Sequence, residues 1–542
     1  MNNNNTNPTS WYENAFVYQI YPRSFADGNG DGIGDLCGIT GKLDYLRELG
    51  VDAVWISPFF KSPQDDCGYD ISDFCDVDPQ YGTLADFDAL LAAAHERGIR
   101  VLLDLVVNHT STQHPWFRAA VADPTSKYHD YYFWRRAGEF ENAVNPEGSG
   151  YGAETWAYVP ESGEYYLRTG YLTEADLNWD NPAVRDEIVA AINFWLDRGV
   201  DGFRCDVIYL ISKEPTLTEF GMGPHLHEYL HELHERCFKP HGAITVAEVW
   251  GQTPETTLTM IGYDREELTA SFFFDHIGLG REGRFIKTEW KPSDFVDILA
   301  HWQEGINGRG ANTLVLENHD QSRIVSRFGD EGEYRHQSAT LLAGLTFLMR
   351  GAAFIYEGQE LGLVNPTFPS LDLIKDIETL DYIADMRAHG MDDAEILRHV
   401  NFGTRDAARV PMPWSGGKNF GFSDADPWLR GVCPYGETNV ACEEADPGST
   451  LNFFKKMIAL KKGSDVLSRG DFRLVDNKDG FFRYERTLDG RTVTVLGNFT
   501  RVDRHVDLSS LSGKELLLTN YPDRKCLYCG TILRPYELVV CS

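Results

Sequence analysis

Long apolar runs are missing from this sequence of 542 residues. No stretch reaches the roughly 18 apolar residues that a membrane-spanning helix needs, so we expect no transmembrane segment. Residues 1–10 contain neither a cationic group nor an apolar run, so they do not resemble a secretory signal peptide. The sequence therefore predicts a cytoplasmic protein that does not bind membranes.

Positive charge and paired cysteines are also scarce. There are 50 Lys and Arg against 82 Asp and Glu, which gives a formal net charge of −32. Such a surface repels nucleic acid, so we expect no nucleic-acid partner. The ten cysteines are scattered singly apart from Cys526 and Cys529, and in a cytoplasmic chain they are expected to be reduced thiols. We expect a monomer or a weak homo-oligomer.

Short β-branched apolar runs alternate with helix-like stretches through the first 360 residues. The helix-like stretches include 84–97, 182–198 and 337–349. Alternation of this kind indicates a parallel sheet, and eight repeats predict an α/β fold of the closed (β/α)8 TIM-barrel type. The eight predicted strands are 16–20, 53–56, 101–105, 202–206, 244–248, 271–275, 313–317 and 353–356.

Uneven spacing of these repeats predicts additional domains. We expect the barrel to occupy 1–104 and 175–470, interrupted after the third strand by an inserted domain at 105–174. A second long excursion, 361–430, follows the eighth strand. Short alternating strands from 471 to 542 predict a C-terminal antiparallel β-sandwich.

Carboxylates end three of the predicted strands or follow them directly. In a barrel the carboxyl ends of the strands share one face, so Asp206, Glu248 and Asp320 are expected to converge there. A single Asp at a strand end is more often a helix cap. Three such carboxylates together favour glycoside hydrolysis, in which one carboxyl protonates the leaving oxygen while another attacks or activates water.

Four segments around these carboxylates resemble the signature regions of the α-amylase superfamily, glycoside hydrolase family 13, and residues 175–180 resemble its fifth region. Similarity extends from residue 18 to about 460, and within the superfamily it is greatest to oligo-1,6-glucosidases and their α-glucosidase relatives. The four segments are Asp104-Leu-Val-Val-Asn-His109, Gly202-Phe-Arg-Cys-Asp206, Glu248-Val-Trp250 and Glu317-Asn-His-Asp320.

The resemblance implies a role for each carboxylate. Asp206 matches the nucleophile that forms a covalent glucosyl-enzyme, and Glu248 matches the general acid/base. Asp320 matches the third carboxylate, which binds sugar hydroxyls and favours distortion of the ring. Direct attack requires the first two carboxyls to lie about 5–5.5 Å apart, and its two inversions give net retention.

The same resemblance implies a set of substrate-binding residues. Arg204 is expected to hold the nucleophile ionised, and Tyr69 to stack on the sugar. The other matching positions bind sugar hydroxyls or border the scissile bond. Arg405 is the alternative to Arg409 as the arginine that accompanies Asp66 and Tyr69. The expected set is Asp66, Tyr69, His109, Arg204, Val207, His319 and Arg409.

Val207, directly after the nucleophile, favours cleavage of α-1,6 bonds in isomaltose, panose and short isomalto-oligosaccharides. α-1,4-specific relatives tend to have Thr or Ala there, and one pocket methyl changes specificity by about 1–3 kcal/mol. Trehalose-6-phosphate hydrolase, sucrose isomerase and α-1,4-glucosidase remain alternatives on the same scaffold. A non-enzymatic heavy chain of an amino-acid transporter is disfavoured because such chains carry a membrane anchor and lose the catalytic carboxylates.

A glycine-rich segment near the N-terminus has oxygen ligands at alternate positions. It resembles the calcium-binding loop of this subgroup, in which magnesium is also possible, and it lacks the final Glu of an EF-hand. The alternative is a polar glycine-rich turn. We expect a structural Ca²⁺ and no organic cofactor. The expected ligands are Asp27, Asn29, Asp31, the backbone carbonyl of Ile33, and Asp35.

Overall fold

A computed structural model describes residues 11–136, 155–214, 220–525 and 532–542. Eight parallel strands form its central sheet, and a bridge between Ala270 and Ala311 joins the first and last strands of the order β13-β12-β11-β5-β2-β1-β17-β16. The predicted TIM barrel is therefore confirmed. The strands are β1 (Phe16–Ile20), β2 (Ala53–Ile56), β5 (Arg100–Val106), β11 (Gly202–Asp206), β12 (Ile244–Ala247), β13 (Ala270–Ser271), β16 (Thr313–Val315) and β17 (Ala352–Tyr356).

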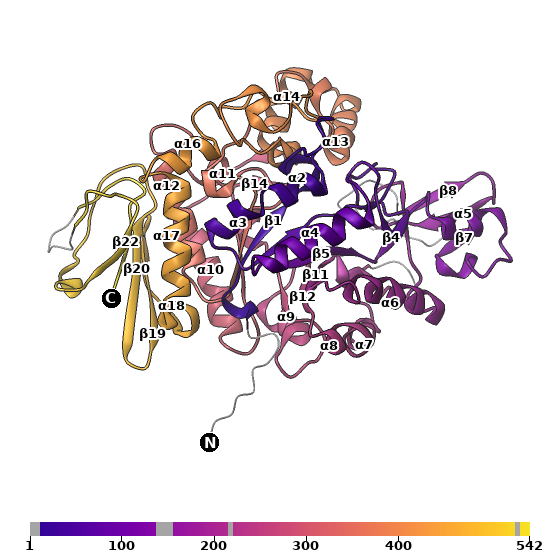
Figure 1. Cartoon of the computed structure of the whole chain (residues 1–542), viewed down its shortest axis with the longest axis horizontal. Coiled ribbons are helices and arrows are strands. Elements are labelled where there is room, and N and C mark those ends of the chain that lie inside the picture. Colours follow the sequence, from indigo (N-terminus) through magenta and orange to yellow (C-terminus); the bar gives the residue numbers. More distant parts are fainter. Residues whose placement is uncertain (1–10, 137–154, 215–219, 526–531) are drawn as a thin grey trace.

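Helices surround this sheet (Figure 1). Thr83 and Asp86 form a capping box that starts α4, and Asn181 caps α6 one residue before a proline at its first position. The helices outside the strands include α2 (Leu36–Gly41), α3 (Leu43–Leu49), α4 (Leu84–Glu96), α6 (Pro182–Leu196), α7 (Leu226–Leu233), α8 (Lys239–His241), α9 (Pro254–Ile261), α10 (Pro292–Ile306), α11 (Ile324–Phe328), α12 (Arg335–Phe347) and α17 (Thr450–Lys462).

The sixth strand is shorter than the sequence predicts. We expected it to span 271–275, but β13 ends at Ser271. Phe272 packs inside the barrel against Trp55, whereas Phe273 stacks on Trp302 of α10 at 4.7 Å. The chain then turns into a short 3₁₀ helix from Asp275 to Gly278. The aromatic run therefore fills space on both sides of the sheet after its ladder has ended.

The inserted segment carries its own small sheet. After β5 come β6 (His109–Ser111), α5 (Pro115–Ala122) and β7 (Trp134–Arg136), followed by β8 (Trp156–Val159), β9 (Glu164–Leu167) and β10 (Glu174–Asp176). Strands β7, β9 and β8 pair in that order, and β10 returns to pair with β6. That pairing brings the exit of the insert back beside the end of β5.

The segment after β17 is largely helical. It contains α13 (Ile377–Ala388), α14 (Asp393–Gly403), α15 (Asp406–Arg409) and, further along, α16 (Val440–Ala445). Figure 1 shows α13 and α14 on one side of the barrel, away from α7, α8 and α9.

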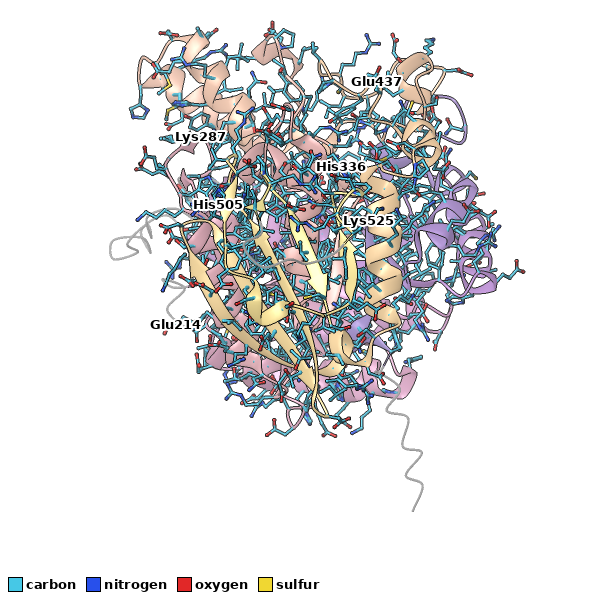
Figure 2. The ribbon with its side chains drawn as sticks, turned by 90° about the vertical axis from the view of Figure 1, so that its left-hand side faces the viewer. Glu214, Lys287, His336, Glu437, His505 and Lys525 are labelled. Atoms are coloured by element: carbon cyan, nitrogen blue, oxygen red, sulfur yellow. The ribbon has the colours of Figure 1, made fainter. Side chains whose placement is uncertain are left out.

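A five-stranded antiparallel sheet ends the chain, as expected. Figure 2 looks onto this sheet, at the end of the molecule opposite the insert. Its order is β18 (Asp471–Lys478), β19 (Phe481–Leu488), β20 (Arg491–Asn498), β24 (Leu538–Cys541) and β22 (Leu516–Thr519), and β21 (Arg504–His505) pairs with β23 (Ile532–Leu533). Leu538 packs so closely on α12 that a Cβ on Gly344 would lie 2.1 Å from it. Cys526 and Cys529 lie outside the described residues.

None of the helices in the described ranges is both long and apolar enough to cross a bilayer.

Candidate active site

A pocket opens at the carboxyl ends of the barrel strands. It gathers several of the expected residues and adds a wall from the insert. Its lining residues are Asp66, Tyr69, Asn108, His109, Thr169, Gly170, Tyr171, Glu174, Asp206, Val207, Leu210, Glu248, Asp320 and Arg405.

Arg204 connects the two expected catalytic carboxyls. Its Nη1 lies 2.7 Å from Asp206 Oδ1 and 2.6 Å from Asp104 Oδ1, and its Nη2 donates to Glu248 Oε2. Arg204 and Asp206 are two positions apart on β11, so their side chains share the inner face of the barrel. The guanidinium thus holds the nucleophile candidate and the acid candidate side by side.

The charges in this group do not balance. One buried guanidinium faces the carboxyls of Asp104, Asp206 and Glu248. Burial, together with the negative charges of Glu248 and Asp104, raises the pKa of Asp206 well above its usual range, although Arg204 opposes the shift. Burial likewise raises the pKa of Asp104 to about 6. The single guanidinium of Arg204 therefore offsets only part of the cost of burying the ionised form of Asp206, which is the form that a nucleophile needs.

Glu248 has two further contacts. Trp250 Nε1 donates to its Oε1 at 3.1 Å, and the backbone N–H of Val207 donates to its Oε2 at 3.4 Å. Val207 has a φ of +31°, a left-handed conformation that a β-branched residue rarely adopts. The chain directly after the nucleophile candidate is therefore held in a strained turn beside the acid candidate.

His319 lies behind the pocket in a neutral form. Burial lowers its pKa to about 3. Gln19 Nε2 donates to His319 Nδ1 at 2.8 Å, so the ring proton is on Nε2, which is 2.7 Å from Tyr69 Oη. The Tyr69 hydroxyl in turn donates to Asp104 Oδ2 at 3.0 Å. This chain of hydrogen bonds fixes Tyr69, whose ring is stacked on His319.

Asp320 is held ionised. Burial alone would favour its neutral form, but the N–H of the neutral His319 ring, 3.3 Å away, and the positive charges of Arg405 and Arg409 outweigh burial and keep the pKa of Asp320 well below its usual range. Arg409 Nη2 lies 2.8 Å from Asp320 Oδ1, and Arg405 Nη1 lies 3.3 Å from the same oxygen.

Arg405, the competitor of Arg409, lines the pocket. It contacts Asp66 Oδ1 and the Tyr171 hydroxyl, each at 3.0 Å. Arg409 is 1% exposed and donates to the backbone carbonyl of His319, so it lies behind Asp320, outside the lining. The two arginines therefore differ in depth, and Arg405 lies nearer the pocket than Arg409, the residue that the sequence favoured.

Lys213 is a buried residue that the sequence analysis missed. Its Nζ lies 2.6 Å from Asn108 Oδ1, 2.8 Å from Asp176 Oδ2 and 2.5 Å from the carbonyl of Leu210. It thereby joins the ends of β5, β10 and β11. Asn108, in a signature segment, and Asp176, in the fifth region, were visible in the sequence, but a lone lysine gives no pattern.

The glycine-rich loop is folded by its own side chains. Asp27 accepts backbone N–H groups from Asn29, Gly30 and Gly32, and Asp31 accepts one from Ile33. Carboxylate and amide oxygens of this kind suit a hard cation.

Asp35 is buried and caps a helix, whereas Asp27 and Asp31 are not buried. Both of its oxygens accept amide hydrogens, from Gly28, Asn29 and Gly38, and it caps α2. Within the described ranges, only an exposed trio elsewhere, His231, Glu235 and Glu266, brings three His, Cys, Asp or Glu ligand atoms within 4.8 Å of one another. The loop oxygens are therefore of the type that binds calcium. The carboxylate oxygens of Asp27, Asp31 and Asp35, however, do not all lie within 4.8 Å of one another.

The barrel and its arginine-bridged carboxyls define a glycoside hydrolase. A family model described as the α-amylase catalytic domain matches residues 19–470. The chain belongs to this family, the α-amylase family of glycoside hydrolases.

Its relatives differ in activity. It is 42% identical to an oligo-1,6-glucosidase of Parageobacillus thermoglucosidasius, over 97% of this chain and 98% of the relative. It is 41% identical to a trehalose-6-phosphate hydrolase of Escherichia coli K12, over 98% of each chain. The solved trehalulose synthase of Pseudomonas mesoacidophila MX-45 superposes with a TM-score of 0.92 at 37% identity, over 98% of this chain and 99% of that one.

Proposed function

We propose that the protein is a retaining, exo-acting α-glucosidase that removes a terminal glucose from small oligosaccharides. The observation that carries this proposal is the contact of Arg204 with both Asp206 and Glu248. Direct attack needs two carboxyls about 5–5.5 Å apart, and a single shared guanidinium keeps them close.

The reaction takes two steps. Asp206 attacks the anomeric carbon while Glu248 gives its proton to the departing glycosidic oxygen, which leaves a glucosyl ester on Asp206. Glu248 then takes a proton from water, whose oxygen attacks the same carbon and releases Asp206. Each step inverts the anomeric carbon, so α-glucose is released.

The terminal glucose is held by the polar wall of the pocket. Asp66 and Asp320 offer carboxylate oxygens to its hydroxyls, and Arg405, which contacts both, offers N–H donors. Tyr69 and His109 complete the wall. Because buried polar groups left without partners are costly, such a wall rejects a sugar that lacks the matching hydroxyls.

For linkage we propose preference for α-1,6 bonds, as in isomaltose and panose. Val207 lines the pocket, and its backbone N–H contacts Glu248, so this residue borders the pocket beside the acid candidate. The oligo-1,6-glucosidase relative at 42% identity supports the same preference.

The test compares kcat/KM of the pure protein for isomaltose, panose, maltose, sucrose and trehalose 6-phosphate, with the anomer released followed by NMR. We expect α-glucose first and isomaltose ahead of maltose. Initial release of β-glucose contradicts retention, and a tenfold preference for maltose contradicts the linkage.

Trehalose-6-phosphate hydrolysis is a second candidate, favoured by a group of arginines. Arg281, Arg284 and Arg327 lie near one another, and Glu378 pairs only with Arg284 among them. Burial, together with the neighbouring arginine charges, lowers the pKa of Arg281 to about 10 and that of Arg327 to about 9. An anion would relieve this repulsion.

Arg281 also lines a second cavity, together with Trp250, whose indole contacts Glu248. Trp250 therefore connects this cavity to the acid candidate. If the substrate is phosphorylated, Arg281→Gln should raise KM for trehalose 6-phosphate and leave KM for isomaltose unchanged.

We also propose that the glycine-rich loop binds a structural Ca²⁺ through Asp27, Asn29, Asp31 and the carbonyl of Ile33, and that the protein works in the cytoplasm as a monomer or weak homo-oligomer. The oxygen-rich loop supports the first proposal. For the second, the cysteines of the described ranges are all free thiols, as is usual in a reducing compartment.

A further inference from the structure

We propose that Asp376 is a positioning residue for the reaction. Its buried carboxylate holds the guanidinium of Arg405 in the orientation in which that group meets Asp66 and Asp320. This role rests on the proposed glucosidase function and extends it to a residue that lies behind the pocket wall and does not touch the substrate.

The guanidinium of Arg405 is held at each of its nitrogens. Its Nε lies 2.6 Å from Oδ1 of Asp376, a side chain that is fully buried. Its Nη1 lies 3.3 Å from Asp320 Oδ1, and its Nη2 lies 3.0 Å from Asp66 Oδ1. Because a guanidinium is planar and rigid, a carboxylate at one edge fixes the direction of the opposite edge. The contact with Asp376 is the shortest of the three.

Arg409 faces the same carboxylate oxygen. Its Nη1 lies 3.7 Å from Asp376 Oδ1, while its Nη2 lies 2.8 Å from Asp320 Oδ1. Each of the two arginines is therefore placed between Asp376 and Asp320. Burial would raise the pKa of Asp376, but the positive charges of Arg405 and Arg409 outweigh burial and lower that pKa. Asp376 thus stays ionised, and two carboxylates match two guanidiniums.

The other acidic neighbours of Arg405 are weaker partners. Burial raises the pKa of Asp66 to about 7, although the nearby arginines oppose the shift. Glu378 Oε2 lies 3.7 Å from Arg405 Nε, whereas Glu378 Oε1 lies 2.8 Å from Arg284. Burial would lower the pKa of Arg405, but its acidic neighbours, with Asp376 foremost, raise it well above its usual range. Asp376 is therefore the main ionic anchor of the pocket arginine.

The start of α13 holds Asp376 in place. Its Oδ2 accepts the backbone N–H of Thr379 at 3.1 Å and the hydroxyl of Thr379 at 2.5 Å, which caps the helix. The backbone N–H of Asp376 donates to Asp406 Oδ2 at 3.1 Å, and Asp406 is the first residue of α15, directly after Arg405. The start of α13 is therefore tied to the segment that carries the arginine.

The cap and the ion pair use different oxygens, so substitutions can separate them. Asn is as good an N-cap as Asp, but an Asn whose oxygen faces Thr379 turns an NH₂ donor toward Arg405 and cannot accept from it. Asp376→Asn thus keeps the start of α13 and removes the contact that orients Arg405. Asp376→Ser also keeps a cap and carries no charge.

The experiment is a double-mutant cycle between positions 376 and 405, measured with 4-nitrophenyl α-glucoside. With Arg405 present, Asp376→Asn and Asp376→Ser should each raise KM about tenfold, with a smaller effect on kcat, because a hydrogen bond to the sugar is misaligned. In an Arg405→Ala background the same substitutions should lower kcat/KM by less than about twofold, because the residue they act through is gone. Asp392→Asn, at the exposed cap of α14, is the matched control and should behave as wild type.

Calorimetry with D-glucose separates this role from the proposed function. Losses of glucose affinity that are coupled between positions 376 and 405 support the role of Asp376 even if no glucoside is turned over. Equal losses with and without Arg405 would mean that Asp376 acts through the fold as a whole, and they overturn the proposal. Wild-type KM and wild-type glucose affinity in both Asp376 variants overturn it as well.

Discussion

Lys213 and Asp176 form a fully buried ion pair, 2.8 Å from Nζ to Oδ2, between the loop after β11 and the returning strand β10. The carboxylate also accepts the hydroxyl and the backbone N–H of Thr169. The pair thus joins the nucleophile-bearing side of the barrel to the wall that carries Thr169 and Glu174.

Breaking this pair should disturb both stability and catalysis. Lys213→Met leaves the carboxylate of Asp176 buried without its cation, which costs about 3–5 kcal/mol. We expect a lower melting temperature and a raised KM, measured by calorimetry and steady-state kinetics. Lys239→Met, at an exposed position, is the matched control. Equal stability of the two variants would mean that the ion pair is not structural.

Removing the acid candidate should have effects that depend on the leaving group. Glu248→Gln keeps the contact with Trp250 but cannot donate a proton to the glycosidic oxygen. Loss of general-acid help costs about 10²–10⁴-fold in rate. We expect that loss for isomaltose and a smaller loss for the first step with 4-nitrophenyl α-glucoside, measured by burst kinetics, because nitrophenolate leaves without a proton. Identical losses for both substrates would assign the proton to another group.

Much of the fold could be predicted because it is encoded locally. Each barrel strand is a short apolar run, and the caps of α4 and α6 lie within three residues of the helix starts that they fix. The sixth strand was predicted too long because Phe272 and Phe273 resemble strand residues, whereas one fills the barrel and the other packs on α10.

The candidate site was only partly predictable. Residues in signature segments, such as Asp206 and Glu248, could be placed at strand ends from the sequence. The depth difference between Arg405 and Arg409 arises in a helix far along the chain from the other pocket residues. Lys213 and Glu174 depend on how β10 returns beside β6, a tertiary contact that no local pattern encodes.

The buried carboxyl of Glu317 predicts a pH-dependent stability. Burial raises its pKa to about 7 although Arg323 Nη1 lies 3.8 Å away. A raised carboxyl pKa contributes stability that is present at acidic pH and lost as pH rises through 7, by at most about 3 kcal/mol. Glu317→Gln should therefore lose less stability than wild type between pH 5 and 8. Parallel melting curves for both proteins over that range would contradict this prediction.

Calcium should stabilise the protein if the glycine-rich loop binds it. Ligand binding to the folded state alone adds about 2.7 kcal/mol at a concentration of 100 Kd. We expect a higher melting temperature with CaCl₂ than with EDTA, and no such difference in Asp27→Asn. Asp35→Asn should be destabilised with or without calcium, because both oxygens of Asp35 accept backbone N–H groups and Asn replaces one of them by an NH₂ donor. A calcium response that persists in Asp27→Asn would place the ion elsewhere.

Substitution at Val207 tests the proposed linkage preference. Val207→Thr replaces one methyl by a hydroxyl of similar size, so the strained turn is kept while the pocket wall beside Glu248 becomes more polar. A change of one pocket group is worth about 1–3 kcal/mol, or about 10–200-fold in kcat/KM. We expect the ratio of kcat/KM for isomaltose to kcat/KM for maltose to decrease by a factor within that range. The kcat for 4-nitrophenyl α-glucoside should change little. Val207→Ile keeps the apolar surface and should preserve the ratio.

If the Thr and Ile variants both give the same ratio as wild type, residue 207 does not select the linkage. The residues that line the second cavity, which include Trp250 and Arg281, would then be the next candidates for selecting it.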